Sequence, residues 1–286
     1  MERKIDFQHE YEKLEHMVCN DYLEGYHYSL DYWICHHFKE WPERQNYLDF
    51  YELRKQEGFD TELIHPRETQ GTNKQITCGD FFRYSEMIIN VVNGILYGNN
   101  DPDFVSSSEL ELKYEDYDAV DAMLTVFIDT VHYDINYFGY EFACDSGNHY
   151  LVVQNNPTAS VVVEHVKPVI ADAVMEYNHY VLKGNLKRKK ELLKVIADDL
   201  ESQRGTLKGL QCPEEDQFFN LVNNCNIRHN NFDPTGGNKY HEKLSKADDD
   251  FMENTYDLAY ELGLICYLVL GRSERNEKLA TIKSLY

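Results

Sequence analysis

Apolar residues recur at helical spacing along most of the chain. Between residues 79 and 97 they repeat every three or four positions on one face, which predicts an amphipathic helix. A second helix of this kind is expected near residues 115–138. Residues 8–57 also indicate helices. One should end near Glu40 and another should begin at Pro42, because proline is favoured in the first turn of a helix.

Strict alternation of apolar and polar residues is confined to one short region. Residues 140–144 and 149–154 alternate, with Asp-Ser-Gly-Asn between them, which predicts a β-hairpin. The pattern therefore predicts a mainly α fold with one small β-hairpin. We expect two domains: an N-terminal helical domain at residues 1–155 that ends in the hairpin, and a C-terminal helical domain at residues 156–286.

Proline residues divide the helices of the C-terminal half. Residues 156–183 have a helical pattern that Pro168 should kink or split, because proline cannot donate the backbone hydrogen bond of a helix interior. A helix is expected at residues 186–200. Pro213, followed by three acidic residues, should open the next helix, since acids favour the positive end of the helix dipole.

The last long helix contains the most apolar stretch of the chain. Residues 262–270 are apolar on every side, so this segment should be enclosed or lie at a subunit interface. We predict a homodimer that uses this helix or the helix beginning at Pro213. The residues expected to face inward on the last long helix are Phe251, Thr255, Leu258, Ala259, Leu262, Ile265, Cys266 and Val269.

Composition restricts the possible partners. The chain has 286 residues, a net charge of −22 and an isoelectric point near 4.9. Such a surface repels nucleic-acid backbones, so RNA would need a local basic patch.

Seven scattered cysteines without a CxxC motif indicate reduced thiols in a cytoplasmic protein. The start of the chain has no apolar signal core, and residues 262–270 are too few to span a bilayer.

Two features of the N-terminal region suggest ligand binding. The aromatic residues between Tyr22 and Tyr51 are interpreted as core, although a base-stacking platform stays open as the alternative. His9, His16 and the run Cys35-His36-His37 contain metal-binding types, but their spacing points them in different directions, so we expect no metal site. The chain also lacks a glycine-rich phosphate loop, and we expect no cofactor.

The candidate chemistry is concentrated between Asn223 and His241. Arg228 and His229 are expected on the last turn of the helix that begins at Pro213, among four asparagines. Arginine offers a planar fork for a phosphodiester, and histidine moves protons near neutral pH. Together they are the groups needed to cleave RNA without a metal. The alternative is that the pair simply caps a helix end.

A basic run gives RNA one possible contact. Residues 187–194 contain the densest cluster of cations in the acidic chain, which is either a solvated helix face or an RNA-facing strip. Nearby acids, including Asp198 and Glu201, are interpreted as surface residues. The predicted RNA-binding residues are Lys187, Arg188, Lys189, Lys190 and Lys194.

The order of these segments resembles the HEPN superfamily, and more narrowly the bacterial abortive-infection proteins of phage defence. A helix ending in Asn-x-Ile-Arg-His-Asn is followed by a polar loop and an acidic, then apolar, helix. The resemblance covers about the last half of the chain and implies a HEPN-like helical bundle with an additional N-terminal helical region. The family hallmark is an arginine, a polar residue and a histidine a few positions on. Arg228 and His229 match, but the next histidine is His241, with twelve residues between Arg228 and His241.

Two functions are compatible with these residues. The resemblance implies a metal-independent endoribonuclease that cleaves cellular RNA. Arg228 would bind the scissile phosphate, His229 or His241 would act as the acid–base group, and Asn230 would orient one of them. In that superfamily two motifs commonly meet across a dimer. The alternative is a non-catalytic interaction or sensor protein of a defence system, which binds a partner protein or a small ligand through its acidic surface.

Overall fold

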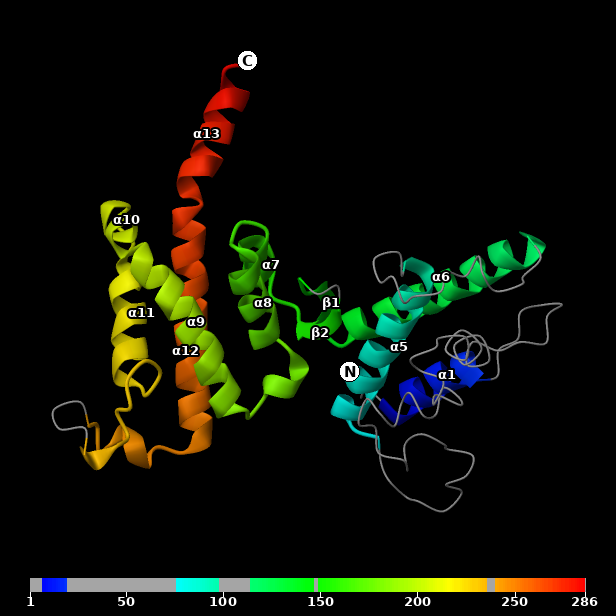
Figure 1. The fold of residues 1–286 in the computed structure, drawn as a ribbon, viewed down its shortest axis with the longest axis horizontal. Coiled ribbons are helices and arrows are strands. Elements are labelled where there is room, and N and C mark those ends of the chain that lie inside the picture. The colour runs from blue at the N-terminus through cyan, green and yellow to red at the C-terminus, as the bar shows by residue number, and fades with distance from the viewer. Residues whose placement is uncertain (1–6, 20–75, 98–113, 147–148, 236–239, 286) are drawn as a thin grey trace, which may run out of the picture. The chain divides into compact units, whose positions relative to one another are not determined.

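The computed structural model describes residues 7–19, 76–97, 114–146, 149–235 and 240–285. The chain divides into two compact units, Met1–Phe142 and Ala143–Tyr286. The described residues form ten α-helices and one two-stranded antiparallel sheet (Figure 1). The predicted mainly helical class with a small hairpin is therefore confirmed.

In the first unit, the described helices are α1 (Phe7–Cys19), α5 (Cys78–Tyr97) and α6 (Tyr114–Tyr137), and each contacts the other two. The helices expected at 79–97 and 115–138 are thus confirmed within one residue at each end. The aromatic residues between Tyr22 and Tyr51, with the cysteines and histidines of that region, lie outside the described residues.

Aromatic side chains form the core that these three helices share. Tyr11 of α1 and Tyr84 of α5 are buried, with ring centroids 4.9 Å apart. A polar contact also joins distant segments: Lys13 Nζ lies 2.8 Å from Oδ2 of Asp134, a side chain that is only 6% exposed. Burial raises the pKa of Asp134, and the hydrogen bond and charge of Lys13 oppose that rise.

The hairpin consists of β1 (Tyr140–Cys144) and β2 (Tyr150–Gln154), as the alternating pattern predicted. Gly139 precedes β1 with a φ of 80°, a left-handed conformation that glycine adopts without steric strain. At the turn, the Asp145 amide donates to the His149 carbonyl at 2.9 Å. Local sequence therefore accounts for both strands and for the point where the chain leaves α6.

The second unit contains most of the described helices. Pro168 splits the predicted segment 156–183, as expected, because α8 starts at this proline. The elements are α7 (Pro157–Val163), α8 (Pro168–Tyr177), η3 (Tyr180–Leu182), α9 (Leu186–Ser202), α10 (Arg204–Gly209), α11 (Pro213–Asn224), η5 (Leu244–Lys246), α12 (Asp249–Leu270) and α13 (Arg272–Lys283).

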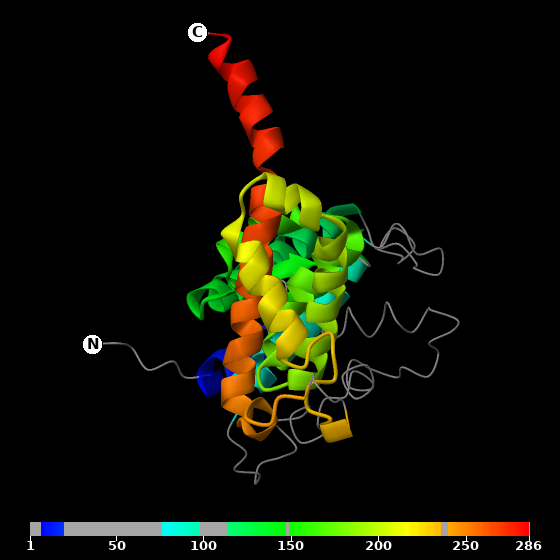
Figure 2. The same cartoon turned by 90° about the vertical axis from the view of Figure 1, so that its left-hand side faces the viewer.

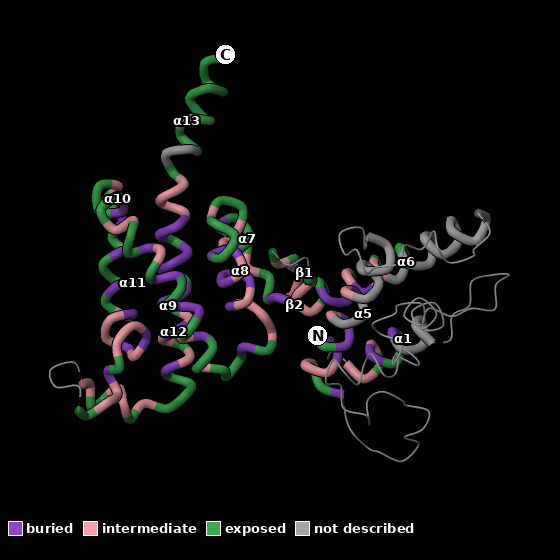
Figure 3. Tube along the Cα trace, in the orientation of Figure 1, coloured by how far each residue is buried: buried purple, intermediate pink, exposed green. Residues whose placement is uncertain are grey.

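Helix α12 is the central helix of this unit. It contacts α7, α9, α10 and α11, and Figure 1 shows α11 and α7 on different sides of it. Close packing occurs at Gly263, where an added Cβ would lie 3.2 Å from the Phe218 ring and 3.3 Å from Ile196. The absence of a side chain at this position lets α12 approach α9 and α11 closely. Figure 3 shows the buried residues gathered along α12 and the faces that meet it.

The inward face of α12 differs in part from the prediction. Ala259, Leu262 and Cys266 are buried as expected, but Phe251, Leu258 and Ile265 are 52%, 49% and 36% exposed. Tyrosine side chains occupy core positions instead, among them Tyr256 and Tyr260. Their rings are apolar and a buried hydroxyl can be satisfied, as when Tyr260 donates to the Val174 carbonyl at 2.9 Å.

Helix α13 extends beyond the other helices of its unit in both views (Figures 1 and 2). Its side chains are mostly exposed, including Leu279 and Ile282. Among the helices described, none is both long enough and apolar enough to cross a membrane.

Candidate functional site

Helix α11 ends at Asn224, so the prediction that Arg228 and His229 occupy its last turn is wrong. Cys225 closes the helix by donating its amide to the Leu221 carbonyl at 2.8 Å. Asn226 then has a φ of 60°, a left-handed conformation that ends a helix and that asparagine tolerates better than most residues. Arg228 and His229 therefore lie in a loop after the helix.

Asn231 organises this loop from a buried position, with 1% of its surface exposed. Its side-chain oxygen accepts from the Asn226 amide at 3.1 Å. Its own amide donates to the His229 carbonyl at 3.0 Å, and its carbonyl accepts from the His241 amide at 2.9 Å. Asn231 was expected only as part of a polar cluster. The sequence signal for its role was the density of asparagine at a helix end, which favours local side-chain to backbone bonds.

The chain between Asn231 and His241 returns to the end of α11. Besides its amide bond to Asn231, His241 places its Nε2 atom 3.3 Å from Oδ1 of Asn224. The two glycines at positions 236 and 237, within this segment, lie outside the described residues. The contacts of His241 bring this distant histidine beside the loop that holds Arg228, in spite of the twelve intervening residues.

The guanidinium of Arg228 contacts α9. Its Nη1 atom lies 2.7 Å from Oε2 of Glu201, and its Nη2 atom lies 3.5 Å from Oδ1 of Asp198. The backbone amide of Arg228 is fixed as well, because it donates to the Val222 carbonyl at 2.9 Å. The two carboxylates interpreted from sequence as surface residues are therefore the partners of the candidate phosphate-binding arginine.

A second arginine belongs to the same charge cluster. Arg204 lies 3.7 Å from Glu201 and also binds Glu215, which is 1% exposed. Its guanidinium stacks on the Phe219 ring, 4.4 Å from the centroid. Bonding to Glu215 raises the pKa of Arg204. Two guanidinium groups thus face an excess of carboxylates, and an incoming phosphate would compete with them for Arg228.

The neighbouring motif residues have local partners. Asn230 is exposed, and its Nδ2 atom lies 3.5 Å from Asp233. Hydrogen bonds from the hydroxyl and then from the amide of Thr235 lower the pKa of Asp233. His229 is half-buried in the same loop. The side chains of this polar loop therefore bond mainly to one another, while His241 contacts the end of α11 and Arg228 contacts α9.

The predicted RNA-binding strip does not form a continuous solvated face. Arg188 makes two bonds to Glu176, at 2.5 and 2.7 Å, and a third to Glu191 at 3.0 Å. Lys190 is half-buried, and burial followed by repulsion from Lys194 lowers its pKa. Among the described residues, the strip's remaining exposed cations without an ion pair are Lys187 and Lys194.

Lys189 points into the interior of the second unit, where 6% of it is exposed. Its Nζ atom lies 2.8 Å from Glu253 and 2.6 Å from Asp257. Tyr177 donates to Asp257 at 2.9 Å and stacks on Tyr260, with ring centroids 4.0 Å apart. Burial and then the Asp257 charge strongly raise the pKa of Tyr177. Lys189 is thus a structural residue that joins α9 to α12.

In the part of the chain that the structure describes, no three His, Cys, Asp or Glu side chains are grouped to hold a metal ion. Comparison with known proteins finds no matching family model, no matching curated protein and no matching solved structure.

Proposed function

We propose that this protein is a non-catalytic helical interaction protein of a defence system, which binds a positively charged partner protein rather than RNA. The observation that carries this proposal is the contact of Arg228 with Glu201 and Asp198. A phosphate bound by Arg228 would have to displace both carboxylates, and the chain's net charge of −22 opposes its approach. The defence role itself rests on the resemblance to abortive-infection proteins.

An exposed apolar stripe on α12 is the surface that we assign to the partner. Phe251, Leu258 and Ile265 lie seven residues apart, so they share one face of the helix. The exposed acids Asp250 and Glu261 lie on the same outward side of α12. A basic amphipathic helix would match both properties, since its apolar face would cover the stripe and its cations would face the acids.

Fluorescence anisotropy tests this proposal with two labelled probes, a basic amphipathic helical peptide and a single-stranded RNA of similar length. We expect the full-length protein to bind the peptide more tightly, with an affinity that falls as salt increases. Replacing Leu258→Ser should weaken peptide binding about tenfold or more, because burial of a leucine stabilises a complex by ~1.5–3 kcal/mol.

Val169→Ser is the matched control, since Val169 is 61% exposed and belongs to α8, not to the stripe on α12. The control should bind the peptide as the wild type does. Tighter binding of RNA than of the peptide, or equal losses in the two variants, would contradict the proposal.

The second candidate is the metal-independent endoribonuclease, which the return of His241 to the motif loop supports. Arg228 would hold the scissile phosphate after release from Glu201. His229 or His241 would take the 2′-OH proton or protonate the leaving oxygen, with Asn230 orienting one of them. The RNA would be held by Arg228 and the exposed lysines of α9.

The homodimer remains a prediction, but the all-apolar segment at residues 262–270 gives it less support than the sequence suggested. Leu262, Leu264 and Cys266 are buried within their own unit, which accounts for most of the all-apolar segment. A self-complementary contact through α12 would also bring its exposed acids together. Light scattering at micromolar concentration measures the oligomeric state directly.

A cytoplasmic location and the HEPN-like classification of the C-terminal bundle also remain parts of this proposal.

A further inference from the structure

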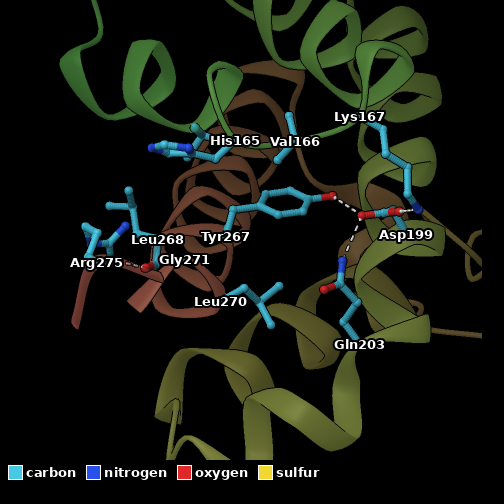
Figure 4. Close-up of a pocket in the computed structure, with 11 residues that line it drawn as sticks. His165, Val166, Lys167, Asp199, Gln203, Tyr267, Leu268, Leu270, Gly271 and Arg275 are labelled. Atoms are coloured by element: carbon cyan, nitrogen blue, oxygen red, sulfur yellow. Dashed lines mark hydrogen bonds and ion pairs between the residues drawn. The ribbon is translucent and has the colours of Figure 1, made fainter. Parts of the chain in front are cut away.

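A pocket of about 270 Å³ lies in the second unit between α7, α9, the end of α12 and the start of α13 (Figure 4). Neither the motif loop nor the exposed stripe of α12 contributes to it. Its lining residues are Val162, His165, Val166, Lys167, Asp199, Gln203, Tyr267, Leu268, Leu270, Gly271 and Arg275.

One end of the pocket is a closed hydrogen-bond network around Asp199. Tyr267 donates its hydroxyl to Oδ2 at 3.0 Å, and Gln203 donates to the same oxygen at 3.2 Å. Lys167 contacts Oδ1 at 2.9 Å. The negative charge of Asp199 is therefore compensated by Lys167, and both of its oxygens have hydrogen-bond or ion-pair partners within the chain. Gln203 still offers its side-chain oxygen to a donor, since no described residue bonds to it.

The other end of the pocket is basic. In Figure 4 the Tyr267 hydroxyl points toward Asp199, and Arg275 and His165 lie at the opposite end of the Tyr267 side chain. Arg275 donates one bond to the Leu268 carbonyl, which fixes the guanidinium at the end of α12. A Cβ atom added to Gly271 would lie 2.8 Å from the Nη1 atom of Arg275. The Arg275 guanidinium therefore packs against the backbone of Gly271, where there is no side chain.

We propose that this pocket binds a small organic anion with a flat apolar body. Its phosphate or carboxylate would be held by Arg275 and His165, because an arginine fork matches the oxygens of both groups. The body would lie against Val162, Val166 and Leu270, and a donor at its far end would reach the Gln203 oxygen. Pockets with apolar walls and a few placed polar groups are the usual form of a small-molecule site.

Isothermal titration of the full-length protein with four probes tests the site. Adenosine 5′-monophosphate represents a phosphate source and indole-3-acetate a carboxylate source. We expect at least one of them to bind with a dissociation constant below about 1 mM. Adenosine, which lacks the charge, and inorganic phosphate, which lacks the body, should each bind about tenfold more weakly. The anion that binds identifies the source.

Gly271→Ala is the most selective variant, because it displaces the Arg275 guanidinium without removing its charge. The φ of Gly271 is −71°, so alanine fits the backbone there and should leave the melting temperature close to that of the wild type. We expect anion affinity to fall about tenfold, as for the loss of a charge-assisted hydrogen bond. Arg275→Met should show the same loss, which guards against an unexpected folding defect in either variant.

Lys283→Met is the control, because it removes one exposed positive charge at the far end of α13, eight residues beyond Arg275. It should bind the anion as the wild type does. Failure of the wild type to bind either anion would overturn the inference, as would unchanged affinity in both Gly271→Ala and Arg275→Met. The peptide titration described above has a separate readout, so the two proposals can fail independently.

Discussion

The Nη1 atom of Arg228 lies 2.7 Å from Oε2 of Glu201. The arginine comes from the loop after α11, and the carboxylate comes from the last turns of α9. Arg228 is 24% exposed and Glu201 is 41% exposed, so the pair contributes only modestly to stability. The pair also occupies the guanidinium that the sequence predicts to bind phosphate.

Removal of the two carboxylates should make Arg228 available to anions. In the double variant Asp198→Asn, Glu201→Gln, we expect the affinity for single-stranded RNA at low salt to rise about threefold, the size of a partly exposed ion pair. Fluorescence anisotropy measures the change. Asp250→Asn with Glu261→Gln removes the same charge from α12 and serves as the control. An equal gain in both double variants would show that only net charge matters.

Cleavage of total RNA in EDTA separates the two candidate functions. If the protein is a non-catalytic interaction protein, RNA should stay intact with both the wild type and Arg228→Ala. The nuclease predicts cleavage that survives EDTA and is lost in Arg228→Ala, because that arginine would act at the transition state. Activity that disappears with EDTA would exclude the metal-free mechanism, and equal activity in both proteins would remove Arg228 from it.

Asn231→Ala should destabilise the second unit by about 1–3 kcal/mol. The change leaves the Asn226 amide without its side-chain acceptor at a position where Asn231 is buried. Urea denaturation followed by circular dichroism gives the free energy of unfolding. Asn230→Ala, in the exposed neighbour, should change stability by less than about 0.5 kcal/mol. Equal values for the two variants would argue against Asn231 as the organiser of the loop.

Lys189→Met should destabilise the protein by about 2–3 kcal/mol, because Glu253 and Asp257 lose their shared cation. The expected value is below the full effect of breaking a buried pair, since the Asp257 side chain is 44% exposed. Lys187→Met, two positions earlier and exposed, should be neutral. The same urea titration measures both variants. A tolerated Lys189→Met would mean that the carboxylates are adequately solvated.

Acid should weaken the same cluster. The pKa of Glu253 is held below its ordinary value of 4.5. Burial acts to raise it, but the Gly184 amide and the charge of Lys189 outweigh that effect. Because the folded-state pKa is depressed, the stabilisation is complete above about pH 4.5 and is lost as pH falls through the folded value. Glu253→Gln should therefore flatten the decline of unfolding free energy below about pH 5. An unchanged slope would contradict this assignment.

The sequence by itself determined the elements whose causes are local. Helical periodicity located α5 and α6, and alternation located the hairpin, because side-chain direction repeats with the geometry of each element. Pro168 and Pro213 marked helix starts, since a missing amide is harmless in the first turn. The long polar loop after α11 also followed from its asparagine, glycine and proline content.

Tertiary structure alone decided which side chains the candidate site residues contact. Arg228 and Glu201 are 27 positions apart, and Lys189 and Asp257 are 68 positions apart. Such pairs form only when helices pack, and the same charged residue is equally compatible with a solvated helix face. In α12 the sequence pattern predicted that Phe251 faces inward, but this side chain is exposed and Tyr256 and Tyr260 are buried instead. Packing chose the tyrosines because distant groups, such as the Val174 carbonyl, satisfy their hydroxyls in the core.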